Sequence, residues 1–149
     1  MLKSVAALML SVTLLLFASG DYSDAAEIEV KMLNKGEKGA MVFEPDFIRA
    51  NPGDTINFVA TDRGHDVVSI PGMVPGTAKP FKSKLGENFS ITLQDEGVYG
   101  VKCSPHYGMG MVALITVGKP VNEAQASEKK HPGKAKQRFA ELFGMLKQP

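Results

Sequence analysis

One stretch of the chain reads Cys103-Ser104-Pro105-His106-Tyr107-Gly108-Met109-Gly110-Met111 and contains the only cysteine. The chain has three histidines, of which a second, His65, follows a glycine far upstream. A cysteine thiolate, two imidazoles and a long, weak axial methionine are the ligands of a blue-copper electron-transfer site. Because Cys103, His106 and a methionine fit on one loop, the sequence predicts a single copper site that His65 completes from a neighbouring loop.

Two methionines of this stretch are candidates for the axial ligand. Met109 and Met111 have the same parity, so strand alternation does not separate them. Either would ordinarily serve as apolar filling. Met111 begins an apolar strand and is held more rigidly, whereas Met109 lies between two glycines. Spacing alone favours Met111 and leaves Met109 open.

The first residues predict export. A basic start at Lys3 precedes an apolar run from Val5 to Phe17, which is short for a membrane span. Small residues suited to signal-peptide cleavage follow up to Ala25. We expect residues 1–25 to be removed as a secretory signal peptide and residues 26–149 to form one domain; an uncleaved anchor is the alternative. An unpaired thiol in an oxidising compartment is a liability unless it is buried or bound to a metal.

Composition excludes one class of partner. The formal net charge of the 149-residue chain is +1, which is unlike a nucleic-acid-binding polycation. A domain of this length buries enough surface to fold without disulfides.

Short alternating segments separated by glycine and proline turns predict an all-β fold. The expected strands include residues 27–33, 55–61, 89–93, 98–102 and 112–117. Seven or eight such strands favour an antiparallel sandwich or barrel. Cys103 then lies at the end of one strand and His65 in the turn after another.

Residues 121–148 lose the alternation and predict a helical extension in two pieces, separated by Pro132-Gly133. One apolar face is formed at spacings of three and four by Phe139, Leu142, Phe143 and Leu146, and we expect it to pack on the sandwich. His131, in the polar segment before the second piece, is interpreted as an ordinary surface residue.

Over essentially the whole mature length, the chain resembles pseudoazurins, which are small cupredoxins. The matching stretches are residues 32–36, 39–45, 50–55, 81–84 and, most strongly, 101–111. The resemblance implies an eight-stranded Greek-key cupredoxin sandwich followed by two helices.

The resemblance also implies one copper ion per chain, bound by His65, Cys103 and His106 with Met111 as the axial ligand. One position departs from the family pattern, because Asp66 stands where pseudoazurins usually have asparagine. In the family, the side chain of this asparagine helps to tie the ligand loops together, and the backbone N–H of the same residue can donate to the thiolate sulfur. Asp66 keeps the backbone N–H but adds a carboxylate. The substitution is therefore expected to affect the reduction potential and the loop hydrogen bonds but not ligation.

The function implied by the resemblance is that of a monomeric periplasmic electron carrier rather than an enzyme. The electron is expected to leave through the edge of His106, in an apolar patch with Met41, Pro105 and Met109. Basic residues are expected around this patch, at Lys35, Arg63, Lys82, Lys102 and Lys134. Such a surface suits brief docking to acidic redox proteins, and the family implies a copper nitrite reductase or c-type cytochromes. Neither nucleic-acid binding nor membrane insertion of the mature protein is expected.

Three other readings of the same residues differ in class. A multicopper oxidase or reductase needs several more histidines than the three present. A copper carrier or storage protein, the main alternative, would favour exposed segments rich in methionine and histidine. Zinc accepts the same cysteine and histidine ligands but gives a colourless protein.

Overall fold

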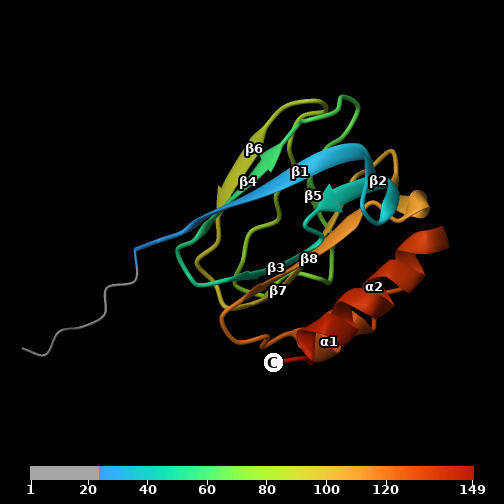
Figure 1. Ribbon diagram of the computed structural model, residues 1–149. Coiled ribbons are helices and arrows are strands. Elements are labelled where there is room, and N and C mark those ends of the chain that lie inside the picture. Colours follow the sequence, from blue (N-terminus) through green and yellow to red (C-terminus); the bar gives the residue numbers. More distant parts are fainter. Residues whose placement is uncertain (1–23) are drawn as a thin grey trace, which may run out of the picture.

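A computed structural model describes residues 24–149 (Figure 1). Residues 1–23, which make up most of the expected signal peptide, lie outside the described residues. One sheet contains, in spatial order, β2 (Gly39–Glu44), β1 (Glu27–Gly36), β4 (Thr55–Val59) and β6 (Phe89–Thr92). The other contains β3 (Phe47–Ala50), β8 (Val112–Val117), β7 (Gly97–Lys102) and β5 (Val68–Ser69). The predicted all-β sandwich of eight strands is thus confirmed.

The sheets are mixed, which differs from the antiparallel sandwich or barrel that the turn spacing favoured. β1 pairs with β4 in parallel, and β3 pairs with β8 in parallel. The reason is that β2 and β3 lie in different sheets, so that β4 returns to the first sheet in the direction of β1. A parallel pair brings the carboxyl ends of its two strands to the same end of the sandwich. The end of β1 and the loop after β4 therefore lie together.

The core fills the space between the two sheets. Along β1, Val30 and Met32 are buried while Glu29 and Lys31 are exposed, which is the alternation of a strand with one wet face. All six residues of β8 are buried instead. β8 is buried on both faces because the core covers one face and a helix covers the other.

The C-terminal extension consists of α1 (Glu123–Ser127) and α2 (Gly133–Leu146), and α2 lies along the outside of the β3-β8-β7-β5 sheet (Figure 1). Its buried residues Ala135, Phe139 and Leu142 pack with Val112 and Leu114 of β8. Burying a Phe or Leu side chain contributes about 1.5–3 kcal/mol. The expected packing of this helix on the sandwich is confirmed. Within residues 24–149, no helix combines the length and apolar character that crossing a membrane requires.

The candidate ligands lie in two connections at one end of the sandwich. His65 is in the loop between β4 and β5. Cys103 and His106 are in the connection between β7 and β8, which also contains the short 3-10 helix η1 (Tyr107–Met109).

Candidate metal centre

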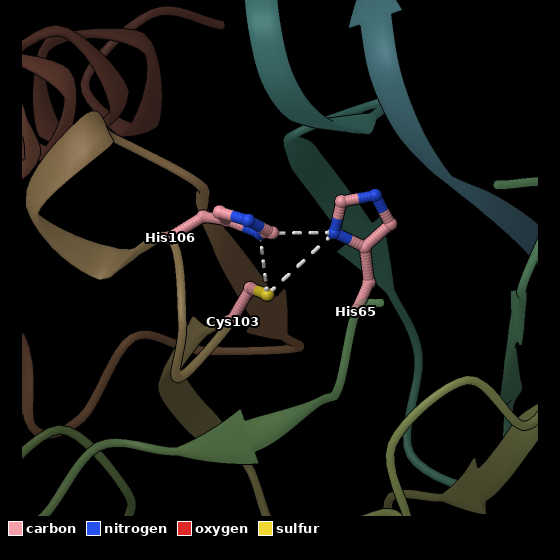
Figure 2. Close-up of side chains that lie close together, drawn as sticks. All are labelled: His65, Cys103 and His106. Carbon is pink, nitrogen blue, oxygen red and sulfur yellow. Dashed lines mark hydrogen bonds between the residues drawn. The ribbon is translucent and has the colours of Figure 1, made fainter. Parts of the chain in front are cut away.

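Three potential ligand side chains converge at this end of the sandwich. The Cys103 Sγ lies 3.8 Å from His65 Nδ1 and 3.5 Å from His106 Nδ1. The two Nδ1 atoms are 3.2 Å apart. Figure 2 shows both rings and the thiol turned toward one another. Among the residues that the structure describes, this is the only group of three or more His, Cys, Asp or Glu side chains close enough together to hold a metal ion.

The spacing of these donor atoms fits one metal ion. Metal–nitrogen and metal–sulfur bonds of about 2.0–2.3 Å place trigonally arranged donors roughly 3.5–3.8 Å from one another. The observed separations of 3.2–3.8 Å lie close to this range. Two imidazole nitrogens and a thiol sulfur are a donor set suited to copper. The residues present therefore fit a single copper ion.

Backbone hydrogen bonds within the second connection place Cys103 beside Met111. The Cys103 N–H donates to the Met111 carbonyl over 3.0 Å, and the Met111 N–H donates to the His106 carbonyl over 3.2 Å. Met111 is fully buried in the same cluster as Cys103, whereas Met109 is 48% exposed in η1. The axial-ligand role of Met111 stays a prediction, which its burial and position support.

Asn34, which no motif of the sequence singled out, fixes the orientation of His65. The fully buried His65 ring places Nε2 2.9 Å from Asn34 Oδ1. With Nε2–H donating to this oxygen, the tautomer that leaves Nδ1 free for a metal is selected. Asn34 itself is held because its N–H donates to Asp62 Oδ2 over 2.7 Å. The sequence placed Asn34 in a polar turn directly after the expected strand 27–33, and nothing around it indicated a contact with His65.

Asp66 joins the two ligand-bearing connections. Its carboxylate accepts a hydrogen bond from the Ser104 N–H, next to Cys103, and the residue is only 5% exposed. The expected link between the ligand loops is therefore formed by an acidic side chain.

The protonation of the metal-free site follows from its burial. Burial lowers the pKa of His65, and the neighbouring His106 acts in the same direction, while Asp62 and Asp66 oppose the shift. The ring is therefore held neutral, the form that binds metals. Burial also raises the pKa of the Cys103 thiol, although hydrogen bonds from the backbones of Asp66 and His106 act against this shift. Metal binding must displace the thiol proton, so it becomes more favourable as pH rises.

The residues expected in and around the apolar patch through which the electron would leave are mostly at the surface. His106 is half-buried beside the exposed Pro105 and Met109, and Met41 is half-buried in a left-handed conformation with φ of 54°. The basic residues Lys35, Arg63, Lys82 and Lys134 are exposed. Lys102 is half-buried, with Nζ 4.9 Å from the centre of the Tyr107 ring.

The structure brings some of these basic residues together. Val68 of β5 is the backbone partner of Lys102 in β7 on one side and forms an isolated β-bridge with Lys82 on the other, so the two lysines flank the same strand. Lys134 and Met109 line one groove, together with Lys38 and Arg138.

His131 is not the ordinary surface residue that the sequence suggested, and that interpretation was wrong. The residue is half-buried, and its Nδ1 lies 2.7 Å from the Tyr107 hydroxyl. Its ring stacks on Phe139 with 4.2 Å between ring centres. Tyr107 lies in the connection between β7 and β8, 24 positions away, so the local sequence around His131 gave no indication of this hydrogen bond.

Comparison with known proteins agrees with this geometry. Residues 30–118 match the family of copper binding proteins described as the plastocyanin/azurin family. A pseudoazurin of Paracoccus pantotrophus is 55% identical over 120 residues, which cover 79% of this chain and 83% of that protein. The solved structure of a pseudoazurin from Sinorhizobium has a TM-score of 0.80 and 43% identity, covering 83% of this chain and 98% of the other. That of Methylobacterium extorquens AM1 has a TM-score of 0.79 and 44% identity, covering 81% and 99%. The chain therefore belongs to the pseudoazurins, within the plastocyanin/azurin family of copper-binding proteins.

Proposed function

We propose that this pseudoazurin, a blue copper electron carrier, works in the periplasm and donates electrons to an acidic redox protein such as a copper nitrite reductase. The observation that carries the proposal is the convergence of one buried thiol and two imidazoles, of which only His106 reaches the surface. A site of this kind takes up and releases an electron without binding a substrate.

In this proposal His65, Cys103 and His106 hold the ion and Met111 is the axial ligand. A bound copper ion supplies the one-electron Cu(I)/Cu(II) couple. The chain holds the donor atoms in place through Asn34 and through the hydrogen bonds between Cys103, His106 and Met111. Donors held this firmly move little between oxidation states, which lowers the barrier to electron transfer.

The route for the electron runs through His106. The ring of His65 is fully buried, whereas His106 is half-buried and stands between the exposed Pro105 and Met109. These uncharged side chains and Met41 form the contact patch. A partner that covers the patch brings its own redox centre close to the imidazole edge.

Charge steers the partner to this patch. We assign the steering role to Lys35, Arg63, Lys82, Lys102 and Lys134. Long-range attraction to an acidic surface raises the association rate, while a contact area under about 1,200 Å² lets the complex dissociate quickly. Both properties suit a monomeric carrier that turns over between a donor and an acceptor. A c-type cytochrome is a second acidic partner of the same kind.

In the same proposal, the basic and apolar residues at the start of the chain direct export of the protein. Residues 1–25 act as the secretory signal peptide, and residues 26–149 form the working domain, whose part from 121 to 148 is the helical extension. We propose no enzymatic role, because the one site of converging ligands among residues 24–149 would hold the electron-carrying ion.

The test is the rate at which the reduced protein transfers electrons to a purified copper nitrite reductase, followed by stopped-flow absorption. We expect a second-order rate constant that falls as ionic strength rises. Lys82→Gln and Lys134→Gln should each lower it about two- to fivefold at low salt, as expected for steering charges. The matched control is Lys119→Gln, since Lys119 is an exposed lysine beyond the far end of β8. A rate that is independent of salt, or an equal loss in the control, would contradict the docking surface.

A further inference from the structure

We infer that the C-terminal extension positions the copper-ligand loop, and that it does so through the hydrogen bond between Tyr107 and His131. Tyr107 directly follows His106 and begins η1, whereas His131 lies just before α2. The inference rests on the proposed ligand role of His106. His131 acts here as a positioning residue, because it touches the loop and not the ion.

The hydrogen bond holds the far end of the tyrosine side chain. The Tyr107 hydroxyl and His131 Nδ1 are 2.7 Å apart, an ordinary distance for a firm hydrogen bond. The ring is also contacted from one face by the ammonium group of Lys102, 4.9 Å from its centre. Tyr107 is thus held at its hydroxyl by the extension and at its face by the end of β7.

His131 is itself anchored to the core. Its ring stacks on Phe139 at 4.2 Å with an angle of 29° between the planes. Phe139 is 2% exposed and packs with residues of β8 under α2. The chain of contacts therefore runs from the residue after His106 to the rigid sheet.

A second contact joins the same two elements through their backbones. A methyl group at Gly133, the first residue of α2, would overlap the carbonyl oxygen of Gly108 in η1. At Gly110, the residue that ends η1 as its C-cap, a methyl group would lie 3.3 Å from Cβ of Lys134. The start of α2 thus lies directly against η1, and the loop has little room to move toward the helix.

Protonation favours this hydrogen bond near neutral pH. Burial lowers the pKa of His131, and nearby Lys129 lowers it further. The neutral ring then accepts at Nδ1 while the phenol donates.

These contacts should restrict the positions that the His106 side chain can adopt. When the residue that follows a ligand is held to the core, the ligand has fewer positions available in either oxidation state, and less rearrangement accompanies electron transfer. Cutting the hydrogen bond should therefore slow electron exchange and alter the spectrum of the oxidised site without removing copper.

The test uses variants that remove the bond from either side in the copper-loaded full mature protein. Tyr107→Phe removes only the hydroxyl, and His131→Phe keeps a ring to stack on Phe139. We measure the electron self-exchange rate by NMR line broadening, the EPR and visible spectra of the oxidised form, and the unfolding temperature. Each variant is expected to slow self-exchange about threefold or more and to shift the EPR hyperfine splitting.

Two comparisons make the test specific. The double variant should be no slower than either single one, because both remove the same bond. His131→Gln, which can still bond to the phenol, should recover part of the rate. Gln125→Ala, at an exposed position of α1 in the same extension, is the control and should change nothing.

Unchanged spectra and self-exchange rates, with only a lower unfolding temperature, would overturn the inference and leave His131 a purely structural residue. Additive losses in the double variant would overturn it as well. A wild-type protein that shows no thiolate-to-copper band would be a different failure, because it would overturn the proposed function and the inference with it.

Discussion

The Asp66 carboxylate accepts a hydrogen bond from the backbone N–H of Ser104, and this bond joins the loop of His65 to the loop of Cys103 across 38 positions of sequence. An asparagine would make the same bond without a charge. Here the acceptor is a buried carboxylate next to the candidate copper ligands, and its charge opposes formation of the Cys103 thiolate, whose pKa is raised chiefly by burial.

Replacing this carboxylate by its neutral isostere should raise the reduction potential. A buried negative charge stabilises the more positive Cu(II) form, so Asp66→Asn should shift the Cu(II)/Cu(I) equilibrium toward Cu(I) by on the order of tenfold, which is about 59 mV for one electron. Potentiometric titration of the copper-loaded protein measures the shift. Glu96→Gln is the control, because Glu96 is an exposed carboxylate just before β7 begins, at the opposite end of that strand from Cys103. An unchanged or lower potential in Asp66→Asn would show that the charge has no such effect.

The two methionines of the ligand loop should respond differently to the same substitution. Met111→Gln replaces a fully buried side chain beside Cys103, so it should shift the potential and the visible spectrum while copper stays bound. Met109→Gln changes a side chain that is 48% exposed and should leave both nearly unchanged. Voltammetry and absorption spectra of the two variants decide the matter. The opposite pattern would make Met109 the axial ligand.

Two glycines of α2 should change stability in opposite directions when each is replaced by alanine. Gly133 has a φ of +49°, and an added methyl group would overlap the Gly108 carbonyl. Gly133→Ala should therefore cost about 1–3 kcal/mol of unfolding free energy. Gly144 lies inside the helix with open space around it, so Gly144→Ala should stabilise by about 0.5–1 kcal/mol. Urea unfolding of the copper-free proteins measures both, and changes of the same sign would contradict this packing.

The copper-free protein should lose stability as pH falls, in part through His131. In the folded state the pKa of His131 lies below its ordinary value of 6.5, mainly because the ring is buried. Between the folded pKa and 6.5 the unfolded chain binds more protons than the folded one, so unfolding becomes easier as pH decreases through this window.

His131→Gln removes this contribution and leaves that of His65 in place. The loss of unfolding free energy between a pH of about 7.5 and one of about 5.5 should therefore be larger in the wild type than in the variant. Urea unfolding at the two pH values measures it. A variant that loses as much as the wild type would show that the native environment does not disfavour the charged imidazole.

Local sequence predicted the parts of the site that are close together in the chain. Cys103 and His106 are three residues apart on one connection, so their convergence needed no knowledge of the fold. The apolar face of α2 also followed from spacing alone, since helix periodicity is local. His65 was proposed because it follows a strand that could pack beside the one ending at Cys103. In the structure β4 and β7 lie in opposite sheets instead, and the loops that follow them meet at one end of the sandwich.

The parts that sequence did not predict depend on contacts between distant segments. Asn34 reaches His65 only because β1 and β4 run in parallel and end at the same side of the sandwich. Alternation within a strand gives no information about its pairing direction. His131 reaches Tyr107 only because α2 begins against η1, which the polar residues before the helix do not indicate.

A thiolate-bound copper ion that cycles between two oxidation states should be visible in the absorption spectrum of the mature protein. Copper is added, the sample is oxidised and then reduced, and Cys103→Ala is treated in the same way. We expect an intense visible band that bleaches and returns reversibly in the wild type and is absent from the variant. A wild-type protein that binds metal but stays colourless, or a variant that keeps the band, would contradict it.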